Sequence, residues 1–174
     1  MHVGGKKWCL VSISVMKNHE KPGSASKGAY WLFTGATFNT IDAKGRVVIP
    51  QKFRDKLSED GFVITRGMDG CVYIYPKPRF QEMTEKLMKM QSTAVEARKL
   101  ARFLLAFAEE GEFDAQGRIC VSQPLREYAG LQKEILTAGI LDRIEIWDRV
   151  RWDEYSEANL EGPDFNDAVK EFDF

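Results

Sequence analysis

Short runs of β-branched and aromatic residues, separated by turn residues, dominate the chain from residue 32 to residue 76. The stretch "FNTIDAKGRVVIP" places such residues on both sides of an Asp-Ala-Lys-Gly loop, and "FVITRG" and "VYIYP" follow it around a turn at 67–70. Runs of this kind, bounded by Gly and Asp, predict strands. In "QKFRDKL" the i, i+4 spacing of Phe53 and Leu57 predicts one or two turns of amphipathic helix.

The same pattern returns 72 residues later as "EFDAQGRICVS", "PLREYAGL", "EILTAG" and "RIEIWD". The match holds without a gap for about forty residues, which is typical of an internal duplication. It pairs Gly45 with Gly117 and Arg46 with Arg118, and apolar positions agree between these identities. In each copy the Asp accepts backbone N–H groups and the Gly supplies a positive φ, as in a hairpin with a type I turn and a bulge.

Helix is predicted between the repeats. Pro78 suits a first helical turn, and the spacing of the following apolar residues predicts one face formed by Phe80, Met83, Leu87 and Met90. Thr93 and Glu96 have the form of a capping box that opens a second helix reaching to Gly111. Because such short strands bury little alone, we expect the two β units to complete one another's barrel. The predicted class is α+β, with two pseudo-repeated half-domains joined by a helical pair.

Composition limits the function classes. The 174 residues are 44% hydrophobic and 29% charged, which is typical of a globular protein, and no apolar run approaches the ~18 residues of a membrane span. Both histidines, His2 and His19, precede the repeats, and the three cysteines have no C-x-x-C spacing. The sequence therefore predicts that the protein has no metal site, no cofactor and no enzymatic activity. The net charge of −1 divides into +5 over residues 1–150 and an acidic remainder, which is compatible with DNA binding.

The Asp-Ala-x-Gly-Arg motifs have two interpretations. In one, the Asp–Arg pairs Asp42–Arg46 and Asp114–Arg118 are only ion pairs that close a turn. In the other, duplication of the motif indicates a working surface, since an arginine at a hairpin tip can bind guanine or phosphate and a two-stranded ribbon fits the major groove. The candidate DNA-binding residues are Arg46, Arg118, Lys44 and Gln116, and the motif residues that support them are Asp42, Gly45, Asp114 and Gly117.

Other arginines and the aromatics favour plainer roles. Arg54 and Arg126 each stand beside an acidic neighbour on a predicted helix, which favours intramolecular pairing. Arg98 and Arg102 share a helix face, for which solvation is the default and nucleic-acid or subunit contact the alternative. The aromatic residues that could stack on bases are at strand ends and helix starts, where core packing is expected. They are Tyr73, Tyr75, Trp147 and Trp152.

The stretches "FTGATFNTIDAKGRVVIPQKFRDKL", "AVEARKLARFLLAFA", "FDAQGRICVSQPLREYAGL" and "RIEIWD" resemble the bacterial MraZ family, over about residues 32–155. The resemblance implies two AbrB-like swapped-hairpin β-barrel units in a cytoplasmic, nucleoid-associated regulator. It also implies a ring homo-oligomer that binds short G-rich direct repeats upstream of its own gene and controls the division and cell-wall cluster. In this family the arginines of the D-x-x-x-R motifs bind DNA. The matching residues here are Arg46 and Arg118, with Lys44 nearby.

The expected organisation has five parts. Residues 1–31 form an N-terminal extension, 32–77 the first unit, 78–110 the helical linker, 111–155 the second unit and 156–174 an acidic tail. The family typically begins M-F-x-G-A, and this chain has Leu32-Phe33-Thr34-Gly35-Ala36. A UUG start codon read internally would give that leucine, so we expect residues 1–31 to be an over-called or optional extension.

Three alternatives remain open at this point. An antitoxin-like regulator would bind a protein partner through its tail. An oligomeric scaffold would use the Asp–Arg pairs only as structural turns. An enzyme is the most distant, because no nucleophile–base pair can be assembled without a histidine in the repeats.

Overall fold

The computed structural model describes residues 31–90, 95–160, 165, 166 and 169. The first repeat and the following helices comprise β1 (Phe33–Thr40), β2 (Arg46–Val48), α1 (Gln51–Leu57), β3 (Phe62–Arg66), β4 (Val72–Pro76), α2 (Lys77–Met90) and α3 (Val95–Leu105). The second repeat comprises β5 (Glu109–Gly111), β6 (Arg118–Cys120), α4 (Gln123–Ala129), β7 (Glu134–Leu141), β8 (Arg143–Asp148) and α5 (Arg149–Asn159). The predicted α+β class and tandem repeat are confirmed.

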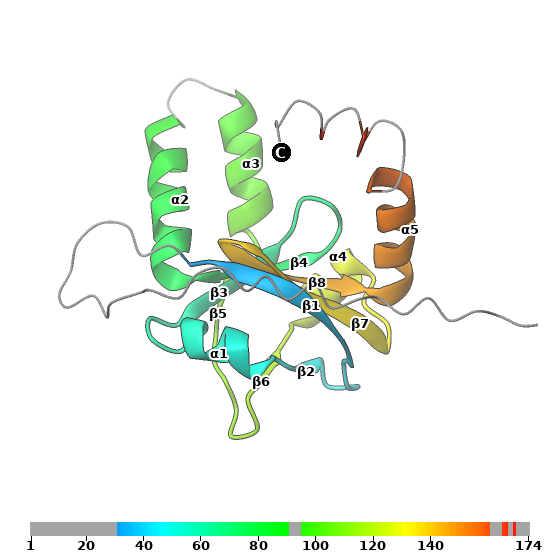
Figure 1. Cartoon of the computed structure of the whole chain (residues 1–174). Coiled ribbons are helices and arrows are strands. Elements are labelled where there is room, and N and C mark those ends of the chain that lie inside the picture. Colours follow the sequence, from blue (N-terminus) through cyan, green and yellow to red (C-terminus); the bar gives the residue numbers. More distant parts are fainter. Residues whose placement is uncertain (1–30, 91–94, 161–164, 167–168, 170–174) are drawn as a thin grey trace, which may run out of the picture.

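The strands of the two repeats are interlaced (Figure 1). Six antiparallel strands form one sheet in the order β1-β7-β8-β4-β3-β5, and β2 pairs with β6 in a separate two-stranded ribbon. β1 pairs with β7 of the other repeat from Phe33↔Leu141 to Thr40↔Glu134, and β5 pairs with β3. Within the first predicted hairpin, the flanking strands share only the Ile41↔Val47 bridge. Each turn therefore reverses the chain as predicted, but its strands find their main partners in the other repeat.

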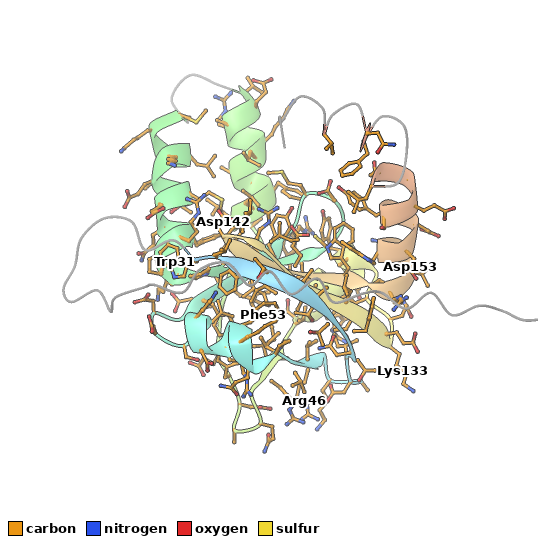
Figure 2. The ribbon with its side chains drawn as sticks, viewed as in Figure 1. Trp31, Arg46, Phe53, Lys133, Asp142 and Asp153 are labelled. Atoms are coloured by element: carbon orange, nitrogen blue, oxygen red, sulfur yellow. The ribbon has the colours of Figure 1, made fainter. Side chains whose placement is uncertain are left out.

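The main core lies between the sheet and the ribbon. Phe33 from the sheet, Val47 and Ile119 from the ribbon, and Phe53 and Leu125 from the short helices are all almost fully buried. Figure 2 shows Phe53 between α1 and the sheet. Since side chains alternate across a strand, the inward position of Val47 and Ile119 turns their neighbours outward. The ribbon thus has one core face and one solvent face.

An aromatic cluster covers the opposite face of the sheet, where α2, α3 and α5 lie (Figure 1). Tyr73, Tyr75 and Trp147 are buried there, and Trp152 packs against Trp147 with ring centroids 5.5 Å apart. The buried Glu145 carboxylate accepts a hydrogen bond from Trp147 Nε1 at 3.0 Å and pairs with Arg143 at 2.9 Å. Tyr73, Tyr75 and Trp147 are core residues, as predicted, and Trp152 is partly buried against them.

The sequence pattern was wrong about two helix features. α3 ends at Leu105, and residues 109–111 form β5, because the free edge of β3 takes them as a strand. Met90 is 57% exposed, so the buried face of α2 does not extend to it. α5 follows β8 directly, as α2 follows β4 in the first repeat.

Several predictions fall on other parts of the chain. The extension up to residue 30, Thr93 of the expected capping box, Cys9 and most of the acidic tail after residue 160 lie outside the described residues. Within the described ranges, every helix is too short or too polar to cross a bilayer.

Candidate nucleic-acid interface

The first motif forms a turn that is organised by one carboxylate. Asp42 Oδ1 accepts hydrogen bonds from the backbone N–H groups of Lys44 and Arg46, both at 2.9 Å, and Asp42 Oδ2 accepts one from Arg46 Nε at 2.7 Å. The N–H of Gly45 donates to the Asp42 carbonyl at 2.9 Å and closes the turn. A single Asp therefore fixes both the turn backbone and the arginine that follows it.

The second motif repeats this geometry. Asp114 Oδ1 accepts from the N–H groups of Gln116 and Arg118 at 2.9 Å, and Asp114 Oδ2 accepts from Arg118 Nε at 2.7 Å. The second turn has one hydrogen bond without a counterpart among those described for the first: Arg118 Nη2 donates to Gln116 Oε1 at 3.0 Å. The ion-pair interpretation of the motif is therefore correct as far as it goes, but it accounts only for the Nε edge of each guanidinium.

These hydrogen bonds favour the ionised carboxylates. The backbone N–H of Arg46, and then its guanidinium and the N–H of Lys44, hold the pKa of Asp42 below its ordinary value of 3.8. The corresponding groups of Arg118 and Gln116 lower the pKa of Asp114. Since three donors converge on each carboxylate, both turns stay charged and closed at neutral pH.

Only glycine fits the last position of each turn. Gly45 has φ of 80° and Gly117 has φ of 70°. A methyl group at Gly45 would lie 2.5 Å from the Val121 carbonyl oxygen. The Gly45 carbonyl in turn accepts the N–H of Val121 at 2.8 Å, and the Gly117 carbonyl accepts the N–H of Ile49 at 3.2 Å. Each turn is thus joined to the strand that follows the other turn.

The ribbon places both arginines on one surface. In the β2–β6 pairing Arg46 stands opposite Cys120, and Val48 stands opposite Arg118. Val47 and Ile119 are buried, so these four residues form the outward face of the ribbon, which we call the ribbon face. Figure 2 shows Arg46 on the side of the molecule away from α2 and α3, with Asp142 on the other side of the sheet.

The ribbon face offers positively charged hydrogen-bond donors. Nη1 and Nη2 of Arg46 have no hydrogen-bond partner among the described residues, and its side chain is 36% exposed. Exposed Lys44 adds an ammonium group to the same turn. A planar guanidinium held by one edge can donate through the other to a carboxylate, a phosphate or the O6/N7 edge of guanine.

The predicted site residues come together at the ribbon. All eight motif residues lie in the two turns at the ribbon.

Arg54 and Arg126 do not pair with their acidic neighbours: Asp55 accepts from Gln51, and Glu127 accepts from Gln123 at 2.7 Å. The two arginines instead lie against the glycines of the opposite repeat's turns. The sequence pattern does not indicate these contacts, because each joins positions that are far apart in the chain.

Other candidate groups lie elsewhere. Arg98 and Arg102 are exposed on α3, on the side of the sheet opposite the ribbon (Figure 1). Cys71 is buried and Cys120 is exposed. In the ranges that the structure describes, His, Cys, Asp and Glu side chains do not gather in any group of three that could hold a metal ion.

The internal repeat is also seen when the chain is compared with known protein families. A family model described as "MraZ protein, putative antitoxin-like" matches the chain twice, over residues 32–103 and 104–174. The starts of these two matches are separated by the 72 residues of the internal repeat.

Individual relatives match over most of their length. A protein of Finegoldia magna named "Transcriptional regulator MraZ" is 43% identical over 143 residues, which are 82% of this chain and 99% of the relative. Proteins with the same name from Moorella thermoacetica and Nocardioides sp. are 46% and 47% identical over 124 residues, which are 71% of this chain and 86% and 85% of the relatives. On the family model, on these relatives and on the two matching repeats, the chain belongs to the MraZ family.

Proposed function

We propose that this chain is a transcriptional regulator that binds double-stranded DNA through the ribbon face and its two turns. The relatives named as transcriptional regulators support regulation in general. The observation that carries DNA binding is the duplicated geometry at the ribbon. Two arginines, each held at Nε by its own aspartate at 2.7 Å, stand on one exposed surface.

The shape and chemistry of the ribbon suit the DNA major groove. A two-stranded ribbon fits that groove, and arginine donates to O6 and N7 of guanine through two parallel hydrogen bonds. The aspartates fix the arginine side chains before binding, which lowers the conformational entropy lost on association. Lys44 and Gln116, at the turn tips, are suited to phosphate contacts that set the register of the ribbon.

Affinity in this proposal comes from several ribbons together. A net charge of −1 is small for a DNA-binding protein. As the family resemblance implies, we propose a ring homo-oligomer whose subunits engage successive short G-rich direct repeats upstream of the protein's own gene, in the division and cell-wall cluster. Linked sites raise the effective concentration, so modest contacts per subunit give specific binding. The protein would act in the cytoplasm, at the nucleoid.

The test is fluorescence anisotropy with DNA from upstream of this gene and a scrambled control, over a series of salt concentrations. Arg46→Ala and Arg118→Ala should each weaken specific binding by about 1–3 kcal/mol or lower the salt slope by about one. Lys86→Ala removes a positive charge from an exposed position of α2, on the other side of the sheet, and should change little. Equal binding by wild type and both arginine variants, each checked for folding, would refute the proposal.

Two alternatives have one supporting observation each. The Asp–Arg hydrogen bonds are those expected of a scaffold with structural turns, in which Arg46→Ala would lower stability and there would be no specific DNA binding to lose. The family description includes the word antitoxin-like, which favours a regulator with a protein partner. A small protein that co-purifies in stoichiometric amounts would support that alternative.

A further inference from the structure

Arg54 of α1 and Arg126 of α4 lie directly against the turn of the opposite repeat. A methyl group at Gly117 would lie 1.8 Å from Arg54 Nη1 and 2.9 Å from Arg54 Cδ. A methyl group at Gly45 would lie 2.9 Å from Arg126 Nε and 3.2 Å from Arg126 Cδ. The two contacts are equivalent under the repeat, and each one crosses between the repeats.

The surroundings of these arginines favour a packing role. Nε of Arg54 and Nε of Arg126 are buried and have no hydrogen-bond partner among the described residues. Arg54 Nη2 donates to Gln51 Oε1 on its own helix. Both arginines are half-buried, but a buried N–H group without a hydrogen-bond partner costs free energy, so the position of Nε against the turn backbone calls for an explanation beyond charge pairing.

The turn backbone is also held from the opposite repeat. The Gly117 carbonyl accepts from the N–H of Ile49, two residues before α1 begins, and the Gly45 carbonyl accepts from the N–H of Val121, two residues before α4 begins. Each turn is therefore held by two contacts from the opposite repeat. One is a backbone hydrogen bond from the residue two positions before the short helix, and the other is the arginine side chain of that helix.

We propose that Arg54 positions the second turn and its Arg118, and that Arg126 positions the first turn and its Arg46. Each ribbon arginine is then set by the aspartate of its own motif and by a helix of the other repeat. The inference rests on the proposed DNA binding at the ribbon face. It opposes the expectation from sequence proximity, in which Arg54 would support Arg46 of its own repeat.

A double-mutant cycle on DNA affinity tests the pairing. Arg54→Ala should weaken binding by about three- to tenfold in the wild-type background and in the Arg46→Ala background, but by less than about twofold in the Arg118→Ala background. Arg126→Ala should show the reverse pattern, losing its effect only with Arg46→Ala. Arg54→Lys, which keeps the aliphatic stem, should restore part of the affinity, and it replaces Arg54→Ala if that variant does not fold.

Two results would overturn the inference. Equal effects of Arg54→Ala in all three backgrounds, with the salt slope lowered by about one in each, would identify Arg54 as an independent phosphate contact. Loss of its effect in the Arg46→Ala background rather than in Arg118→Ala would place its action within its own repeat.

A second measurement needs no DNA. Gly117→Ala should lower the melting temperature in every background because φ at this position is 70°, and the loss should be smaller in the Arg54→Ala background than in the wild type or Arg126→Ala, because the three atoms nearest to the added methyl group all belong to Arg54. An equal loss in all three backgrounds would contradict the contact. If this pattern holds but no ribbon variant changes DNA affinity, the proposed function fails. If Arg118→Ala weakens DNA binding and Arg54→Ala weakens it further by the same factor in the Arg118→Ala background as in the wild type, the positioning role fails and the proposed function stands.

Discussion

Arg118 donates from Nη2 to Gln116 Oε1 at 3.0 Å, whereas the equivalent residue of the first turn is Lys44, which has no acceptor to offer Arg46. Arg46 is also the more exposed of the two side chains, at 36% against 27%. The two turns therefore have the same backbone hydrogen bonds but present different side chains at the surface. The first presents two positive charges and a pair of terminal nitrogens without a partner in the described part of the chain, and the second presents one guanidinium that already donates to Gln116.

Exchanging these two residues should exchange the electrostatic contribution of the turns. Lys44→Gln removes a phosphate contact and should lower the salt slope of DNA binding by about one, and Gln116→Lys should raise it by about one. Lys86→Gln, on exposed α2, is the matched control and should leave the slope unchanged. The slope is obtained from anisotropy titrations at several salt concentrations. An unchanged slope for Lys44→Gln would exclude Lys44 from phosphate contact.

Asp42 should give the protein a stability that is lost in acid. Its pKa is lowered in the folded protein, above all by the backbone N–H of Arg46. The unfolded chain therefore takes up the proton first as the pH falls, so this contribution is complete well above pH 3.8 and disappears as the pH falls through the lowered pKa. Asp42→Asn should lower the melting temperature at pH 7 and flatten its fall between about pH 5 and pH 3.

Asp60→Asn, in the exposed turn after α1, controls for the loss of one carboxylate. Melting curves of the three proteins across this pH range make the comparison. The same acid dependence in wild type and Asp42→Asn would show that the turn carboxylate does not contribute.

Gly45 and Gly61 separate backbone strain from steric clash. Both have positive φ, 80° and 77°, but a methyl group at Gly61 meets nothing within 4 Å, and at Gly45 it meets the Val121 carbonyl oxygen. Gly61→Ala should cost about 1 kcal/mol of unfolding free energy. Gly45→Ala should cost a further ~1–3 kcal/mol because the β2–β6 junction must move. Urea unfolding measures both, and equal costs would argue against close packing of the first turn.

Cys120 should report occupancy of the ribbon face. It is exposed opposite Arg46 in the ribbon, whereas Cys71 is buried and burial raises the pKa of its thiol. Modification by N-ethylmaleimide should weaken DNA binding by the wild type, because the adduct occupies the face between the two arginines. Bound DNA should slow the modification. Cys120→Ser is the control, and an equal loss of binding after treatment of that variant would assign the effect to another cysteine.

The two repeats should not fold separately. β1 pairs with β7 over eight residue pairs, and β2 and β3 also take partners from the second repeat. Fragments 31–106 and 107–174 should each lack a cooperative thermal transition by circular dichroism, and their equimolar mixture should regain one. A cooperative transition in either fragment alone would show that its strands can pair internally.

The sequence determined the local structure of the candidate site. The Asp-Ala-x-Gly-Arg spacing predicted the turn, the glycine with positive φ and the Asp–Arg pair, because these depend on contacts within five residues. It also predicted the repeat and the short helices at 51–57 and 123–129, whose apolar spacing is local. The α+β class followed from these elements.

Tertiary structure alone decided which strands pair and what lies beneath the turns. β5 was predicted as part of a helix because residues 100–107 are apolar at helical spacing, and only the free edge of β3 makes residues 109–111 a strand. The sequence likewise placed Arg54 beside an acidic neighbour, and interlacing of the repeats carries it instead to Gly117. Periodicity reports which face of an element is buried but not which partner buries it, so contacts between repeats had to come from the fold.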